Sequence, residues 1–105
     1  MGKNKDRESL IRLLTNTVVH EIVAEHTNKV ESRHFLASEI IEYRSQTENV
    51  AKSHTWNEED INLIEEKTLK KIKEKLNSKY FDVKYSEKEM TEKLREMLKI
   101  IFKKS

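Results

Sequence analysis

Turn-forming residues are almost absent from this chain. Its 105 residues include one Gly and no Pro. These two residue types supply the backbone angles of the tight turns that join neighbouring β-strands. A β-sandwich or β-barrel would therefore lack the residues that it needs at each hairpin, whereas helices need fewer of them. The composition predicts an all-α fold.

The length and the charge balance predict one folded domain. A chain of 105 residues has room for a single modest core. Roughly a quarter of the residues are Leu, Ile, Val or Phe, and the net charge is only +2. Disordered chains usually combine an apolar fraction below about 20% with a large net charge. We therefore expect a single helical domain over residues 1–105, with residues 1–5 disordered.

Apolar residues recur every three or four positions in four segments, which is the spacing of a helix face. The expected helices run from about Asp6 to His26, from about Glu31 to Lys52, from Asn57 through the lysine-rich stretch, and from Ser86 towards the end of the chain. The first segment carries a second apolar face, so it is either buried on two sides or bent. The pattern predicts a four-helix, mostly antiparallel, bundle-like assembly.

Local sequence patterns mark the starts of two helices and the connection between them. Asn57 precedes three acidic residues, as expected for an N-cap and a first turn that meets the positive end of the helix dipole. Ser86 and Glu89 have the spacing of a capping box. Between these helices, in the stretch Tyr80 to Tyr85, the residues Phe81, Val83 and Tyr85 alternate with polar ones, which is typical of a strand. We expect an extended connection laid over the bundle end, or strand pairing across a dimer.

Glutamates beside the apolar faces raise the possibility of a metal site. Burying an unpaired carboxylate is unfavourable, and carboxylates converging from three helices would bind Mg²⁺ or Mn²⁺. The segment Glu39-Ile40-Ile41-Glu42 resembles the Glu-x-x-Glu motif of the MazG-type nucleotide pyrophosphohydrolases, although their Glu-x-x-Asp motif has no counterpart here. One hypothesis is therefore a Mg²⁺- or Mn²⁺-dependent nucleotide phosphohydrolase; the other is that these side chains reach solvent or a basic partner. The candidate ligands are Glu21, Glu39, Glu42 and Glu65.

Lysines crowd the second half of the third expected helix, where only Glu74 offsets them. Such a cluster is a candidate surface for the phosphates of nucleic acid. Against this hypothesis, helical spacing spreads the lysines around the axis, the pI is about 8.8, and basic residues also suit a helix C-terminus. The candidate residues are Lys67, Lys70, Lys71, Lys73, Lys75 and Lys79.

Four apolar residues lie outside the main stripes and indicate a surface for a partner: Ile41, Leu63, Ile100 and Phe102. The chain has no Cys and no Gly-rich phosphate loop, so an enzyme would have to be metal-dependent. No run approaches the ~18 apolar residues of a membrane helix. We expect a cytoplasmic, non-enzymatic interaction or regulatory domain that forms a homodimer and needs no cofactor.

Overall fold

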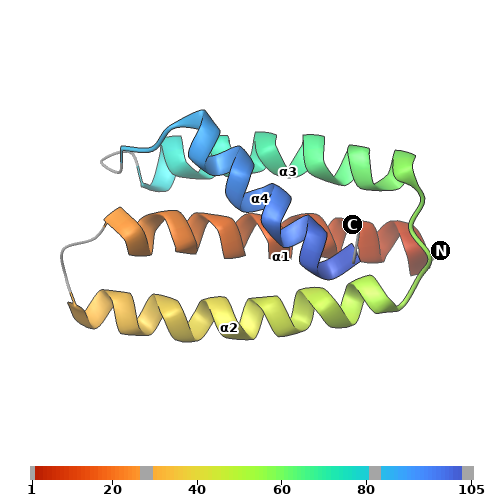
Figure 1. Cartoon of the computed structure of the whole chain (residues 1–105), viewed down its shortest axis with the longest axis horizontal. Coiled ribbons are helices and arrows are strands. Elements are labelled where there is room, and N and C mark those ends of the chain that lie inside the picture. The colour runs from red at the N-terminus through yellow and green to blue at the C-terminus, as the bar shows by residue number, and fades with distance from the viewer. Residues whose placement is uncertain (1, 27–29, 81–83, 103–105) are drawn as a thin grey trace.

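The computed structural model describes residues 2–26, 30–80 and 84–102, with the backbone alone for residues 2 and 30–36. Four helices follow one another along the chain: α1 (Gly2–His26), α2 (Val30–Lys52), α3 (Glu58–Lys79) and α4 (Glu87–Phe102). They alternate in direction, so α1 and α3 run parallel to each other (Figure 1). The described residues contain no strand. The predicted all-α, four-helix fold is confirmed.

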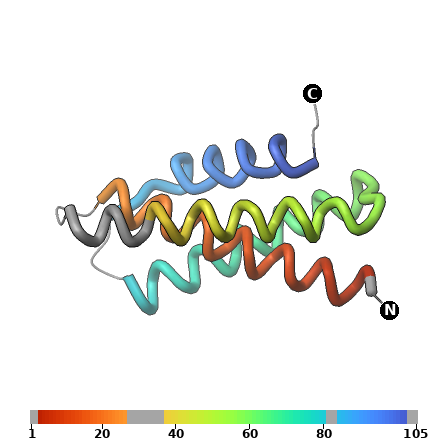
Figure 2. Tube along the Cα trace, turned by 90° about the horizontal axis from the view of Figure 1, so that it is seen from below, coloured from red at the N-terminus to blue at the C-terminus, as the bar shows by residue number. Residues whose placement is uncertain are grey.

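Helix α1 is the central element of the bundle. It lies between α2 and α3, and α4 crosses one face of the molecule diagonally (Figures 1 and 2). All three other helices contact α1. Its two apolar faces are therefore both covered: Leu10, Leu14 and Val18 on one face and Val19 and Ile22 on the other are fully buried. Burial on two sides is the alternative that the structure favours for this segment.

The core is closed by the expected stripes of α3 and α4. Ile64, Ile72 and Leu76 of α3 are fully buried, as is Leu94 of α4. The buried Thr68 hydroxyl of α3 has no hydrogen-bond partner among the described residues. The hydroxyls of Thr15, Thr17 and Thr47 are satisfied locally; Thr17, for example, donates to the carbonyl oxygen of the residue four positions earlier (2.8 Å). Such local bonding lets a polar side chain occupy a buried helix position.

The predicted N-cap of α3 is present. The side chain of Asn57 accepts a hydrogen bond from the Asp60 amide (2.8 Å), and the Asp60 carboxylate accepts one from the Asn57 amide. At α4, the Ser86 hydroxyl accepts from the Glu89 amide (3.1 Å). The Glu89 carboxylate lies instead against His26 of α1 (3.1 Å), because this partner from another helix competes for it.

The structure differs from the sequence-based expectation at the start of the chain, and part of one expected connection lies outside the described residues. Helix α1 begins at Gly2, so residues 2–5, expected to be disordered, are helical. Lys3 and Arg7 both pair with Asp60 at the start of α3 (2.9 and 3.8 Å), and this contact stabilises the first turns. In the connection between α3 and α4, residues 81–83 lie outside the described residues. Tyr80 and Tyr85 at its borders pack against the core.

Candidate functional site

A long groove separates α1 from α3 on the protein surface. It consists of two adjoining hollows of about 390 and 550 Å³, which share Arg12 and Lys71. The described residues that line them belong to α1 and α3. We call this feature the α1–α3 groove; its lining residues are Lys5, Glu8, Ser9, Ile11, Arg12, Thr15, Asn16, Lys67, Lys71, Glu74, Lys75 and Ser78.

Helical spacing explains why basic residues from both helices meet there. Lys67, Lys71 and Lys75 are four positions apart, so they follow one side of α3. Lys5 and Arg12 are seven positions apart and therefore share a side of α1. Because the two helices run parallel, these rows lie side by side.

The register of the two rows is fixed at two points. At one end, Lys3 and Arg7 of α1 pair with Asp60 of α3. Further along, the Lys75 ammonium donates to the side-chain oxygen of Asn16. The groove between these points is thus held by contacts that connect its two walls.

The basic residues of the groove have no acidic partner among the residues that the structure describes. Within the part of the chain that the structure describes, none of them forms an ion pair, although Glu8 and Glu74 also line the groove. Four of them are exposed and Lys75 is half-buried. The five are Lys5, Arg12, Lys67, Lys71 and Lys75.

Basic residues elsewhere fall into two groups: some form ion pairs, whereas Lys52, Lys70, Lys79, Lys84 and Lys99 have none among the described residues. Ion pairs connect Lys93 with Glu25 and Arg95 with Glu65. Lys73, which neighbours the groove lysines in sequence, pairs with Glu87 of α4. Glu8 and Glu74 offset part of the charge of the five basic residues in the described lining, which is left with an excess of positive charge.

Positive charges lie close together at the Lys75 end of the groove. Burial lowers the pKa of Lys75, and the nearby charge of Lys79 lowers it further. Its hydrogen-bond partner, Asn16, is neutral and offers no compensating charge. An anion placed here would relieve this repulsion and favour the charged form of Lys75.

His20 of α1 lies close to these lysines. Burial is the main cause that lowers its pKa; Lys75 and Lys79 lower it further, while Glu39 opposes them. A carboxylate oxygen of Glu39 is 3.1 Å from His20 Nδ1, but it lies outside hydrogen-bonding geometry, and this nitrogen has no hydrogen-bond partner among the described residues. The Tyr43 ring packs beside the imidazole at 5.4 Å.

The predicted metal ligands do not converge. Glu21 accepts from Arg44 (2.6 Å), and Glu65 accepts from Arg95 (3.0 Å). Glu39 lies against His20, and Glu42 accepts from a neighbouring glutamine one turn along α2 (3.4 Å). Across residues 2–26, 30–80 and 84–102, no three acidic, His or Cys side chains form a group able to hold a metal ion. Each glutamate has its own partner.

The predicted lysine cluster divides into two sets. Lys67, Lys71 and Lys75 line the groove, whereas Lys73 pairs with Glu87. Lys79 lies 5.9 Å from the centre of the Tyr80 ring, and the exposed Lys70 is not among the lining residues. Sequence reasoning missed Lys5 and Arg12. Their spacing with Asn16, seven and then four positions, is the signal that marks this polar side of α1.

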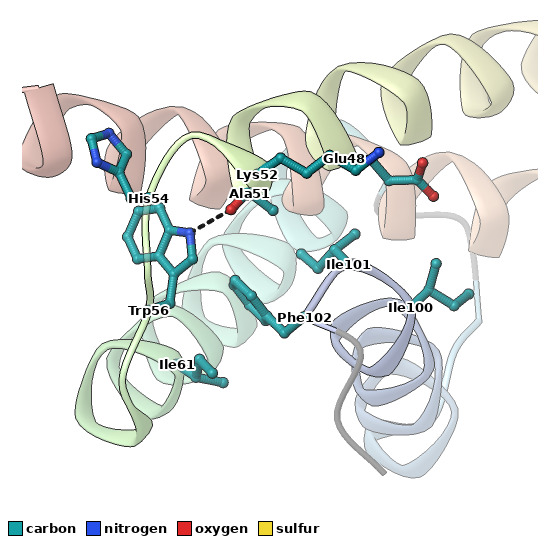
Figure 3. A pocket seen from close by; sticks show the side chains of 9 residues that line it. All are labelled: Glu48, Ala51, Lys52, His54, Trp56, Ile61, Ile100, Ile101 and Phe102. Carbon is teal, nitrogen blue, oxygen red and sulfur yellow. Dashed lines mark hydrogen bonds between the residues drawn. The ribbon is translucent and has the colours of Figure 1, made fainter.

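The predicted apolar surface is scattered. Ile41 is 71% exposed and Ile100 is 48% exposed, while Leu63 and Phe102 are half-buried. Ile100 and Phe102 line a hollow at the end of the bundle, where Phe102 lies beside Trp56 and the Trp56 indole N–H donates to the Ala51 carbonyl (Figure 3). The hollow there measures about 490 Å³, and Glu48, Lys52 and His54 contribute polar groups to its lining.

Two further findings concern the chain as a whole. Among the described helices, none combines the length and the apolar content needed to cross a bilayer. Comparison with protein-family models, curated proteins and solved structures found no match to this chain.

Proposed function

We propose that this protein binds nucleic acid by its phosphates along the α1–α3 groove. The observation that carries the proposal is the row of five basic side chains without an ion pair among the described residues. Proteins contact nucleic-acid phosphates mainly through Lys, Arg and polar groups, and release of the condensed counterions drives such binding. The groove presents these groups on one side of the molecule.

The dimensions of the groove favour a polymer over a small anion. Eight residues separate Lys67 from Lys75, which corresponds to about 12 Å along a helix. One strand of a B-form duplex carries a phosphate about every 3.4 Å along the axis. The lysine row therefore spans three to four phosphates, and Arg12 and Lys5 contribute further charge from α1.

Self-association remains a prediction with weaker support. A stable interface typically buries about 800 Å² on each partner. The large apolar side chains that are exposed among the described residues are Ile41 and Ile100, and the core cluster already closes within one copy of the chain. Light scattering tests this prediction directly: a mass that stays at 12.6 kDa over a wide concentration range would refute the homodimer.

A metal-dependent phosphohydrolase also has little support. Glu21 and Glu65, which were expected to provide carboxylates from different helices, are engaged by Arg44 and Arg95. A carboxylate already paired with a guanidinium is a poor starting point for a metal site, since the ion would have to displace its partner.

The test compares two variants of equal net charge on immobilised DNA that carries duplex and single-stranded stretches. The groove variant replaces Lys67, Lys71 and Lys75 by Gln. The control variant replaces Lys84, Lys88 and Lys99, which are exposed and lie outside the groove.

At about 50 mM salt, where phosphate contacts are strong, we expect the wild type and the control variant to be retained and the groove variant to elute. Equal retention of the two variants would refute the groove as the binding site. Circular dichroism of all three proteins checks that the helices are intact.

A further inference from the structure

We infer that the nucleic acid in the α1–α3 groove is a double helix rather than a single strand. This inference rests on the proposed function and specifies its ligand. It follows from the kind of side chain that the groove offers and from the kind that it lacks.

None of the described residues that line the groove is aromatic. Proteins that bind single strands usually combine a basic groove with aromatic side chains on which the bases stack, and each stacked base contributes substantially to affinity. A single strand in this groove would be held by its phosphates alone, and its ordering on binding would oppose association.

The three tyrosines of the chain are engaged in contacts within the protein. The Tyr85 hydroxyl donates to Asn77 (3.0 Å), and its ring packs against the core. Tyr80 also packs against the core and carries the Lys79 ammonium near its ring. Tyr43 contacts the His20 imidazole. None of these half-buried rings is among the described residues that line the groove.

Phosphate contacts alone favour a duplex. The logarithm of the binding constant changes with the logarithm of the salt concentration by about −0.9 per neutralised phosphate on B-form DNA and by about −0.7 on a single strand. With one phosphate for each of the five basic side chains, the slope is about −4.5 for a duplex and about −3.5 for a single strand. If the salt-independent parts are equal, the duplex binds about tenfold more tightly at 0.1 M salt.

The two rows of basic residues also have the rigidity that suits a duplex. They lie on two helices whose register is fixed by the Lys3–Asp60 ion pair and the Lys75–Asn16 hydrogen bond. A duplex presents its phosphates in a fixed arrangement, so both backbones are already ordered and the basic side chains are the groups that lose freedom on binding. Preorganised partners of this kind lose less conformational entropy on binding.

The experiment measures fluorescence anisotropy with a labelled 20-base-pair duplex and with a labelled 20-nucleotide oligothymidine of the same length, both at 0.1 M salt. We expect the duplex to bind about tenfold more tightly. Equal binding, or tighter binding of oligothymidine, would overturn the inference while leaving the proposed function intact. Binding of neither probe, at this concentration or at 0.05 M salt, would overturn both.

The Lys71→Gln variant tests whether the duplex binds in the groove. Because Lys71 belongs to both hollows of the groove, its replacement should weaken duplex binding about eightfold at 0.1 M salt by removing one phosphate contact. An unchanged affinity for the duplex would show that the duplex binds elsewhere, and this result would also overturn the inference.

Discussion

The salt dependence of DNA binding is the property that the α1–α3 groove predicts most directly. If Lys5, Arg12, Lys67, Lys71 and Lys75 each neutralise one phosphate, a plot of the logarithm of the binding constant against the logarithm of the salt concentration has a slope of about −4.5. The affinity for a duplex should then fall about 500-fold between 50 and 200 mM salt.

Single substitutions provide the sharper form of this prediction. Lys71→Gln removes one cation and should reduce the slope to about −3.6, so the same change in salt lowers affinity only about 150-fold. Lys99→Gln removes the same charge from α4, outside the groove, and should leave the slope at about −4.5. The assay is fluorescence anisotropy of a labelled 20-base-pair duplex at a series of KCl concentrations. A common slope for both variants would refute the reasoning, as would a wild-type slope shallower than about −2.

Three further predictions concern stability. Burial lowers the pKa of His20, so the unfolded chain takes up the proton first as the pH falls. The free energy of unfolding should therefore decrease below pH 6.5. Urea unfolding should show this decrease in the wild type and a smaller one in His20→Gln. Leu14→Ala removes a fully buried side chain at the centre of α1 and should lower the free energy of unfolding by about 3–4 kcal/mol, whereas a loss below about 1 kcal/mol would contradict its place in the core. Asn57→Ala removes the cap of α3 and should lower it by about 1 kcal/mol; Asn62→Ala, an exposed site on the same helix, is the control and should change it much less.

The helices were predictable because each needs only local information. The 4-3-4 spacing of Met90, Leu94, Met97 and Ile101 places one apolar stripe on α4, and all four side chains are buried. The cap at Asn57 depends on contacts within four residues of one another. In α1, however, the local pattern left two alternatives, and only the position between α2 and α3 explains why both of its faces are apolar.

The site was harder to predict because it depends on the register between helices. Viewed along α3 alone, the lysines spread around the axis; α4 supplies Glu87 for Lys73, and α1 supplies Arg12 opposite Lys71. The glutamates considered as metal ligands illustrate the same problem, because the partner of Glu65 is thirty residues away in sequence. Periodicity within one helix carries no information about such pairs.

Amide NMR of the ¹⁵N-labelled protein, titrated with an unlabelled 20-base-pair duplex, tests the central claim most directly. We predict that the largest chemical-shift changes occur at Arg12, Asn16 and Lys71, on the two walls of the groove, while Ile41 and Ile100 change little. Changes centred on α2 and α4, or no change at low salt, would contradict the assignment of the α1–α3 groove as a nucleic-acid-binding site.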